Sequence, residues 1–352
     1  MIQGLNNLVS YKVKTTKGDI PVEKINIGDK VLSYYTGEEL EVKDVVKSEL
    51  SEVWNVFYTD GRMARYCSDS LIYTGDTIRF FKDCINEPDL HKIFKPLNQY
   101  QINFNNDTVK DQLNPDPYLA GALYVYGDFD DEYVNLPITA SEGIRLFINK
   151  YLFDDKILED PISLENHRIH FRSSKTNELI TWKEFFPIKY LEYPLTYTRL
   201  IPNEYMYSTV KNRIQFISGI LDVNFRDDIF HTNPGVVNSS KFVLEQVQSM
   251  LHSLGVISLI RYDPSISKFK GYDYRLDIMR TSNQWPAFFY SIKNIETLIR
   301  ETDTMGNEGP NFSVLPKMIQ RKVSSGYTYN LVLDKPGQLY LSSNYLPRVS
   351  LL

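Results

Sequence analysis

Two cysteines and a histidine are the side chains with the clearest potential to bind a transition metal. Cys67 and Cys84 are the only cysteines of the chain, and His91 follows them. A structural zinc site needs cysteine and histidine ligands at short, characteristic spacings, which these three residues lack. The sequence therefore predicts two ordinary, half-buried thiols in a chain without a disulfide framework, as expected in a reducing compartment.

Basic and aromatic side chains that could bind nucleic acid alternate in a second region of the chain. The basic residues are Lys241, Arg261, Lys268, Lys270, Arg275 and Arg280, interleaved with Tyr262, Phe269, Tyr272 and Tyr274. Between 241 and 300, eight Lys and Arg residues stand against five Asp and Glu, an excess of three positive charges. Because Asp263, Asp273 and Asp277 lie among the basic residues, an ordinary charged outer face of a sheet is an equal alternative.

The composition limits the class of protein. The 352 residues suffice for two or three compact units, and 42% hydrophobic with 13% aromatic residues can form substantial cores. A net charge of −5 argues against a uniformly basic protein but leaves room for a local basic groove. We find no signal peptide and no apolar run of about 20 residues, so we expect no membrane partner and an intracellular location, in the host cytoplasm or nucleoid.

The order of the expected elements indicates one β domain interrupted by an insertion. Residues 1–92 contain short apolar–polar alternations broken by glycines, and Asp60-Gly61 is a hairpin-turn signal. Residues 93–115 are polar and contain prolines, which is typical of a connector. The mixed segment 116–312 follows, and 313–352 returns to strand character. The predicted class is therefore α+β.

Inside the insertion, the hydrophobic spacing predicts helices and a hairpin. Helices are expected over 118–127, 211–223 and 241–254, the last because apolar residues recur at helical spacing before Gly255. Residues 256–263 and 272–279 are expected to pair as a β-hairpin.

The first eighty residues resemble the Hint fold of inteins and hedgehog autoprocessing domains. The resemblance lies in a glycine-bearing turn followed by IPVEKINIGDKVLSYY and a later DG hairpin. The matching residues are Gly18, Ile25, Gly28, Asp29, Val31 and Leu32. The last 25 residues resemble the closing intein block, with Tyr329, Leu331, Val332 and Tyr340 in its strand pattern. The resemblance implies that both chain ends build one Hint-like domain.

The centre of the chain resembles a two-motif LAGLIDADG homing endonuclease. The segment FISGILD, residues 216–222, occupies the second motif, and the first is PYLAGALYVYGDFDD, beginning at Pro117. Gly121 and Gly219 lie 98 positions apart, as in members with two pseudo-symmetric halves. The resemblance implies that these glycines let two helices pack closely at a pseudo-twofold axis, in a domain spanning 116–312.

Most residues that intein splicing requires are missing. The place of the first-residue nucleophile falls near Asn6, an amide that cannot act as a nucleophile. The place of the Thr-x-x-His motif holds Cys67–Ser70, and that of the terminal His-Asn pair holds Pro347-Arg348. We therefore expect a chain that does not splice.

The positions implied for DNA cleavage are also altered. Members of the endonuclease family place one acid at the end of each motif helix, where the pair binds divalent cations. Tyr126 and Asn224 occupy these positions here, so enzymatic activity stays an open question. Asp128, Asp222 and Asp227 are substitute candidates, with Asp128 and Asn224 as metal ligands, and Mg²⁺ is expected only if cleavage survives. The alternative is that these aspartates are solvated residues at helix ends or in loops.

Three functions follow from these observations. The first is a free-standing, intein-derived protein that is splicing-dead and cleavage-impaired and retains duplex DNA binding. The second is a structural or interaction protein, for example a component of a viral particle with protein partners in a larger assembly, which would place it in the virion. The third is a nuclease with relocated ligands. We favour the first.

Overall fold

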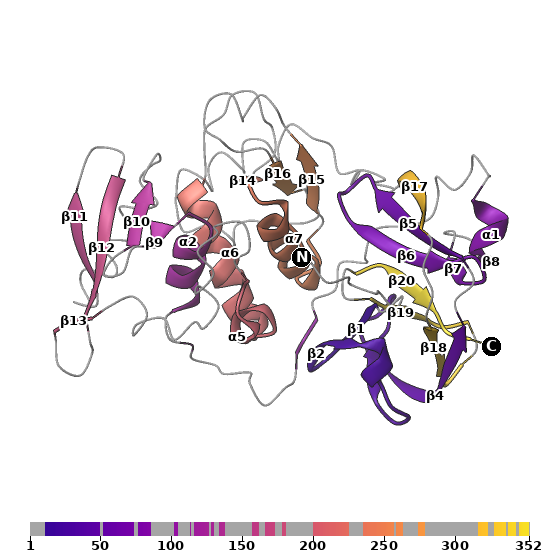
Figure 1. Cartoon of the computed structure of the whole chain (residues 1–352). Coiled ribbons are helices and arrows are strands. Elements are labelled where there is room, and N and C mark those ends of the chain that lie inside the picture. Colours follow the sequence, from indigo (N-terminus) through magenta and orange to yellow (C-terminus); the bar gives the residue numbers. More distant parts are fainter. Residues whose placement is uncertain are drawn as a thin grey trace, which may run out of the picture. The chain divides into compact units, whose positions relative to one another are not determined.

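The computed structural model consists of two compact units (Figure 1). Unit 1 comprises Met1–Asp107, His252–Leu259 and Pro310–Leu352, and unit 2 comprises Thr108–Leu251 and Ile260–Gly309. Within them the structure describes residues 11–49, 52–73, 77–85, 102–104, 113, 116–126, 128–129, 134–137, 157–161, 166–172, 178–180, 200–224, 235–256, 258–262, 274–278, 316–322, 327–335, 337–342 and 345–351. None of the helices in these ranges has the length and hydropathy of a membrane span.

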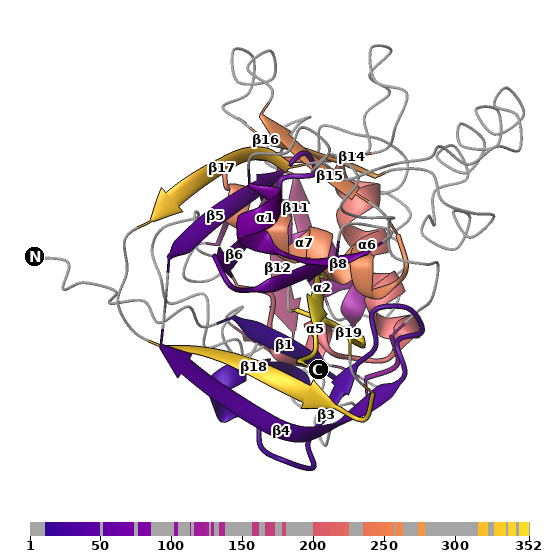
Figure 2. The ribbon, with the colours of Figure 1, turned by 90° about the vertical axis from the view of Figure 1, so that its right-hand side faces the viewer.

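Unit 1 is built mainly from short β-strands contributed by both ends of the chain. Its elements are β1 (Lys12–Thr15), β2 (Gly18–Pro21), η1 (Val22–Lys24), β3 (Lys30–Leu32), β4 (Glu39–Glu49), β5 (Val53–Tyr58), β6 (Met63–Cys67), β7 (Leu71–Tyr73), β8 (Ile78–Phe80), α1 (Phe81–Cys84), β17 (Pro316–Lys322), β18 (Tyr327–Leu333), β19 (Leu339–Leu341) and β20 (Pro347–Val349). Strand β18 pairs antiparallel with β4, and β17 pairs antiparallel with β5. Figure 2 shows the resulting sheets, β17-β5-β6 and β18-β4-β3.

Two glycine turns hold the N-terminal strands of unit 1 in register. Gly28 has φ +89°, and its N–H donates to the Val42 carbonyl, while the Asp29 carboxylate accepts from the Asn26 N–H. Gly61 has φ +88° in the turn between β5 and β6, as its Asp-Gly signal predicted. Both glycines adopt a left-handed conformation that other residues reach only at a cost.

A buried apolar cluster joins the two ends of the chain in unit 1. It consists of Val13, Val22, Ile25, Val31, Val42, Leu331, Leu333 and Tyr340. These side chains come from β1, η1 and the residue that follows it, β3, β4, β18 and β19, so burial of the N-terminal and C-terminal segments is coupled.

Unit 2 contains the mixed segment. Its elements are α2 (Pro117–Tyr126), β9 (Asp128–Phe129), β10 (Val134–Pro137), β11 (Ile157–Pro161), β12 (Asn166–Arg172), β13 (Leu179–Ile180), α5 (Asn203–Met206), α6 (Val210–Asn224), β14 (Gly235–Asn238), α7 (Lys241–Ser253), β15 (Ser258–Tyr262) and β16 (Tyr274–Ile278). The last two residues of α7 and the first two of β15 fall in unit 1.

Part of the strand order in unit 2 recurs. After α2 the sheet runs β11-β12-β10-β9, with β13 also paired to β12, and after α6 the sheet runs β14-β16-β15. In both sheets a central strand, β12 or β16, lies between two strands that precede it in the chain, and it pairs antiparallel with β10 or β14, respectively. The first sheet also contains β9 and β13, which have no counterpart in the described part of the second.

The helices expected from hydrophobic spacing are confirmed. Those expected over 118–127, 211–223 and 241–254 correspond to α2, α6 and α7, and β15 and β16 are neighbouring strands as expected for the hairpin. The turn between these strands lies outside the described residues. Within the expected connector, Ile102 and Phe104 are buried, and the Ile102 N–H donates to the Ser253 carbonyl.

The two thiols are more deeply buried than the half-buried state that the sequence predicted. Cys67 and Cys84 are both free and buried, with 3% and 1% of their surface exposed. Cys84 packs in the apolar cluster with Tyr66 and Phe81. His91 lies outside the described residues.

Candidate functional site

Helices α2 and α6 contact each other through their backbones at Gly121 and Gly219. A Cβ atom on Gly121 would lie 1.9 Å from the Phe216 carbonyl oxygen, and one on Gly219 would lie 2.0 Å from the Tyr118 carbonyl oxygen. Each glycine thus faces the backbone of the other helix. Small residues at a helix crossing allow this approach, which any side chain would prevent.

Aromatic rings flank the crossing and fix its position along the helices. The Phe216 ring packs against Tyr124 with centroids 5.9 Å apart and against Tyr205 with centroids 5.4 Å apart. The Arg213 side chain is fully buried, and its Nε donates to the Ser208 carbonyl at 3.0 Å. This packing stabilises α6 against rotation about its axis.

The two crossing helices end at equivalent points. Helix α2 ends at Tyr126 and α6 ends at Asn224, each five residues after its glycine. These are the positions where the sequence resemblance implies acids. Asp128 lies beyond the end of α2, in β9, and Asp222 lies in the last turn of α6. Asp227 lies outside the described residues. The side chains of Tyr126, Asp128, Asp222 and Asn224 lie outside them as well.

The last residues of the two helices carry neutral side chains. Tyr126 supplies a phenol and Asn224 a carboxamide, whereas hard divalent cations are held mainly by carboxylates. Asp222 lies in the last turn of α6, and Asp128 lies just beyond α2. Among the residues that the structure describes, no three His, Cys, Asp or Glu side chains gather into a metal site.

An ion-paired network lies in the sheet β14-β16-β15 of unit 2. The Asp277 carboxylate accepts from Arg275 Nε at 2.5 Å and from Arg261 Nε at 2.8 Å. Arg275 and Asp277 are buried, whereas the Arg261 side chain is 47% exposed. Gly235 makes room for this network, because a Cβ there would lie 3.2 Å from Arg275 Nε.

The six basic residues predicted to bind DNA therefore differ in exposure and in ion pairing where the structure describes them. Arg261 is exposed next to Tyr262, which is 61% exposed and packs edge-on against Tyr274. Arg275 is buried and paired with Asp277, a pairing that strand periodicity could have indicated because residues two apart share a face. Lys241 pairs with Glu245 on α7 at 3.0 Å. Lys268, Lys270 and Arg280 lie outside the described residues.

A buried arginine occupies the middle of unit 1, at the place where the sequence lacks the terminal His-Asn pair. The Arg348 guanidinium lies between two tyrosine rings, 4.5 Å from the centroids of both Tyr11 and Tyr66. Arg348 is only 8% exposed, and its buried Nε has no hydrogen-bond acceptor among the described residues. The contact with the two ring faces favours the guanidinium cation at this place.

A hydrogen-bonded pair of tyrosines, the partly buried Tyr11 and the buried Tyr340, lies near Arg348. The Tyr11 and Tyr340 hydroxyls are hydrogen-bonded at 2.6 Å, and Tyr11 also donates to the Tyr329 carbonyl at 3.2 Å. Burial raises the pKa of Tyr340 well above its usual value, and the neighbouring Tyr11 adds to the effect. Burial likewise raises the pKa of Tyr11, although Arg348 opposes the shift.

The segment Cys67–Ser70 forms a closed turn. Ser70 Oγ accepts from the Cys67 N–H at 2.9 Å, and the Ser70 N–H donates to the Cys67 carbonyl at 2.9 Å. Burial raises the pKa of the Cys67 thiol, so it is protonated at neutral pH. Ser70 thus stabilises backbone in the place where the Thr-x-x-His motif would polarise a peptide bond. Asn6 lies outside the described residues.

Other charges buried in unit 1 are paired. Lys14 Nζ contacts Asp19 at 2.5 Å and lies over the Tyr345 ring at 4.3 Å. Arg62 pairs with the buried Asp60 and donates to the Tyr345 carbonyl at 3.0 Å. Sequence reasoning did not identify this polar interior: the ion pairs are local, but Tyr345, which contacts both Lys14 and Arg62, is far from them in the chain.

Comparison with known proteins gives two kinds of structural neighbour. The gp41-1 intein matches 28% of this chain and 68% of its own, with 19% identity and a TM-score of 0.20. The homing endonuclease I-DmoI, in a variant complexed with its target DNA, matches 54% of this chain and 96% of its own, with 17% identity and a TM-score of 0.30. The chain's structural neighbours are thus an intein and a LAGLIDADG homing endonuclease.

A third neighbour is the full-length DUF199/WhiA protein from Thermatoga maritima, which matches 54% of this chain and 61% of its own, with 12% identity and a TM-score of 0.34. No family model matches the sequence. No curated protein matches it either. All three TM-scores lie below 0.5, so the function proposed below rests on this chain's own residues.

Proposed function

We propose that this chain is an intein-derived protein that binds duplex DNA through unit 2, cleaves it poorly or not at all, and does not splice. In this proposal, 1–92 and 313–352 form a Hint-like domain, 93–115 connect it to the insertion, and 116–312 form a LAGLIDADG-type domain. The observation that carries the proposal is the backbone contact of α2 and α6 at Gly121 and Gly219, together with the recurring three-strand orders β10-β12-β11 and β14-β16-β15. Such a duplicated unit offers two similar sheets, as a pseudo-symmetric duplex target requires.

The DNA-binding part of the proposal is supported by the exposed residues of β15. Arg261 can contact phosphate, and the exposed Tyr262 ring lies beside it. Lys268, Lys270 and Arg280 would add charge from the neighbouring chain segments. Asp277 holds two arginines in place, so releasing Arg261 to DNA leaves the carboxylate paired with Arg275.

Impaired cleavage is supported by the chemistry of the helix ends. Tyr126 and Asn224 lack the negative charge that would hold divalent cations at a scissile phosphate. Helix α2 ends before Asp128, so this aspartate is the substitute ligand that most needs testing.

Loss of splicing is supported by the interior of unit 1. Arg348 fills the space between Tyr11 and Tyr66, and the Cys67 thiol is protonated. Neither residue supplies a nucleophile or a histidine acid at that place.

A salt-titrated binding assay tests the DNA-binding proposal. Anisotropy of labelled genomic duplex fragments should show affinity that falls steeply between about 50 mM and 200 mM salt, because each phosphate contact releases counterions. Arg261→Ala should reduce the slope of log K against log salt by about one contact. Lys43→Ala is the matched control in unit 1, since its side chain is 48% exposed and also ion-paired. No affinity at low salt, or an equal effect of both variants, would contradict DNA binding by this sheet.

Two further assays test the remaining parts. Incubation of the parent protein with supercoiled genomic plasmids and Mg²⁺ should leave them un-nicked; nicking that Asp128→Asn abolishes would instead establish a relocated ligand. Placed between two reporter proteins, the chain should remain in an intact fusion, and a ligated reporter product would show that it splices.

A further inference from the structure

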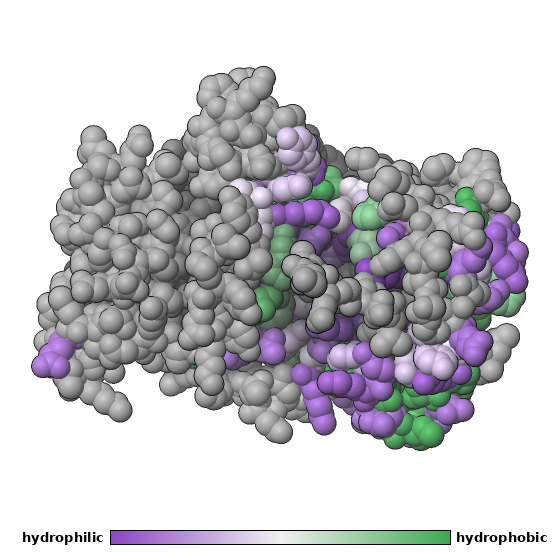
Figure 3. All heavy atoms as spheres, in the orientation of Figure 1, coloured by the Kyte–Doolittle hydropathy of each residue, from purple (hydrophilic) through white to green (hydrophobic). Residues whose placement is uncertain are grey.

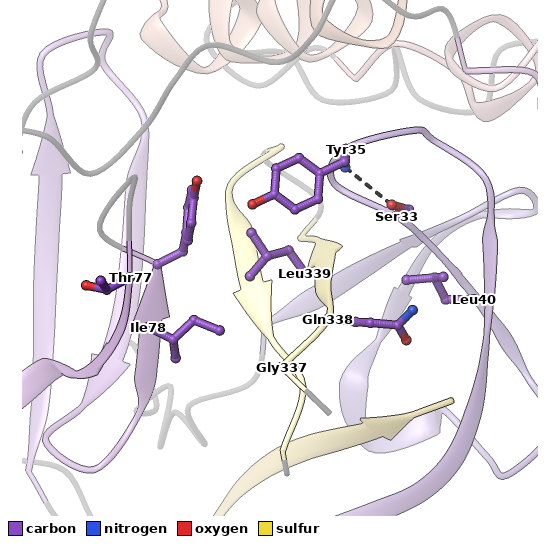
Figure 4. A pocket seen from close by; sticks show the side chains of 9 residues that line it. Ser33, Tyr35, Leu40, Thr77, Ile78, Gly337, Gln338 and Leu339 are labelled. Atoms are coloured by element: carbon purple, nitrogen blue, oxygen red, sulfur yellow. Dashed lines mark hydrogen bonds between the residues drawn. The ribbon is translucent and has the colours of Figure 1, made fainter. Parts of the chain in front are cut away.

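A pocket of about 480 Å³ opens in unit 1 (Figure 4). It is lined by Ser33, Tyr35, Leu40, Tyr73, Thr77, Ile78, Gly337, Gln338 and Leu339. Its volume falls within the roughly 300–1,000 Å³ that small-molecule sites occupy. Figure 4 shows Ile78 and Thr77 on one side, Leu40 and Gln338 on the other, and Leu339 and Tyr35 between them.

The pocket has a fixed aromatic wall. The rings of Tyr35 and Tyr73 lie edge-to-face with centroids 6.2 Å apart, and the buried Tyr34 packs against both, at 5.4 Å and 6.4 Å. Tyr35 is 46% exposed. An incoming aromatic ring can therefore extend an edge-to-face cluster that already exists.

The nine described lining residues carry no group that is charged at neutral pH, since they are of Ser, Tyr, Leu, Thr, Ile, Gly and Gln types. Burial, followed by the hydrogen bond to Tyr73, raises the pKa of Tyr35 to about 12, so its phenol stays neutral. A charged ligand would lose its hydration here without gaining an opposite charge.

One polar group of the lining has spare hydrogen-bonding capacity. Gln338 Oε1 accepts from the Lys335 N–H at 3.1 Å, which orients the carboxamide, and its NH₂ group has no acceptor in the described part of the chain. Ser33 Oγ is already engaged by the N–H groups of Tyr35 and Thr36. The free donor lies in the pocket lining, so a ligand acceptor can meet it.

The backbone along the pocket wall is already hydrogen-bonded. The Leu339 carbonyl accepts from the Tyr34 N–H at 3.0 Å, and the Gln338 carbonyl accepts from the Ser350 N–H at 2.8 Å. These two carbonyls are therefore not available to an extended peptide. The side chains of the lining supply the remaining contacts for a compact ligand.

We propose that this pocket binds a flat, uncharged aromatic small molecule that carries a hydrogen-bond acceptor. The ring packs against Tyr35 and Tyr73 over the aliphatic side chains of Leu40, Ile78 and Leu339. The acceptor, such as a carbonyl oxygen, receives a hydrogen bond from the Gln338 NH₂ group.

Benzamide is the probe that tests this proposal on the full chain, by saturation-transfer NMR with titration. Cyclohexanecarboxamide lacks the aromatic ring and should bind about two- to tenfold more weakly. Benzoate carries a charge and should bind about tenfold more weakly or not detectably. Toluene lacks the acceptor and provides the reference for the Gln338 variant.

Variants assign the binding to this pocket. Tyr35→Ala should weaken benzamide binding about three- to tenfold, whereas the control Tyr327→Ala, which removes a tyrosine of 42% exposure elsewhere in unit 1, should leave it unchanged. Gln338→Met should weaken benzamide about two- to tenfold and leave toluene unaffected. Thermal melts show which variants are folded. If Tyr35→Ala unfolds, the Gln338→Met variant alone assigns the binding to this pocket.

Three results would overturn the proposal: no benzamide saturation, equal binding of benzoate and benzamide, or benzamide binding unchanged in folded Tyr35→Ala or Gln338→Met.

Discussion

Replacing Gly219 with alanine measures directly how closely α2 and α6 pack. The new Cβ would lie 2.0 Å from the Tyr118 carbonyl oxygen and 2.8 Å from the Ala122 nitrogen. Ordinary contact begins at 3.4 Å, so the helices must separate by more than about 1 Å, because both obstacles are backbone atoms that cannot rotate away. Separation would also loosen the Phe216 packing against Tyr124.

Two opposing free energies decide the outcome of this substitution. Alanine in place of glycine in a helix stabilises by about 1 kcal/mol. Overpacking a dense core costs about 1–3 kcal/mol, and more where the backbone must move. We therefore expect Gly219→Ala to lower the free energy of unfolding by about 2 kcal/mol.

Urea unfolding followed by helical circular dichroism is the assay, with Lys211→Ala as the control. Lys211 is exposed on the same helix, so its replacement should change stability by less than about 0.5 kcal/mol. Gly121→Ala should behave like Gly219→Ala, and the double variant should lose less than the two single losses together, because one methyl group already separates the helices. A Gly219→Ala protein that is as stable as the parent, or more stable, would refute the close crossing.

Two further predictions concern the interior of unit 1. Arg348→Met should change the free energy of unfolding by about 1 kcal/mol or less, because the lost contact with two rings is offset by removing a buried charge whose Nε has no acceptor in the described part of the chain. Arg348→Glu should cost more than about 3 kcal/mol. Urea unfolding followed by Trp54 fluorescence checks both variants, and equal losses would contradict the cation–π assignment. Burial, and then Arg62, holds the pKa of His252 well below its usual value. On acidification the unfolded chain therefore protonates His252 before the folded chain does, so the free energy of unfolding should fall as the pH drops below about 6.5. His252→Phe keeps a ring against Tyr345 and removes the titrating group. The variant should therefore lose less stability than the parent on acidification, by up to about 1.4 kcal/mol per pH unit between about pH 6.5 and 5. If the difference in unfolding free energy between variant and parent stays constant over this range, His252 does not contribute to the pH dependence.

Local patterns in the sequence predicted much of the secondary structure. Helical spacing and Gly255 placed α7 to within one residue at its end, and Asp60-Gly61 placed the β5–β6 turn. These features depend on neighbouring residues, so a short window of sequence contains the cause. The close packing at the glycines of α2 and α6 was expected from the resemblance to two-motif LAGLIDADG proteins, not from the local pattern alone.

Long-range packing could not be derived from the same patterns. Nothing near Arg348 in the sequence indicates Tyr11 and Tyr66 as its neighbours, because the three are brought together by strand pairing across the whole chain. The pocket beside Tyr35 likewise combines residues 33–40, 73–78 and 337–339. Arg275 is different, since its burial with Asp277 follows from the two-residue period of a strand once β16 is recognised.

A proton–proton contact between the rings of Tyr124 and Phe216 tests the helix crossing most directly. These residues are 92 positions apart, and their centroids lie 5.9 Å apart across α2 and α6. In a sample protonated only at tyrosine and phenylalanine, a NOESY spectrum should contain a cross-peak between these rings that disappears in both Tyr124→Leu and Phe216→Leu. Absence of such a cross-peak in the folded parent protein would contradict the paired arrangement on which the proposed function depends.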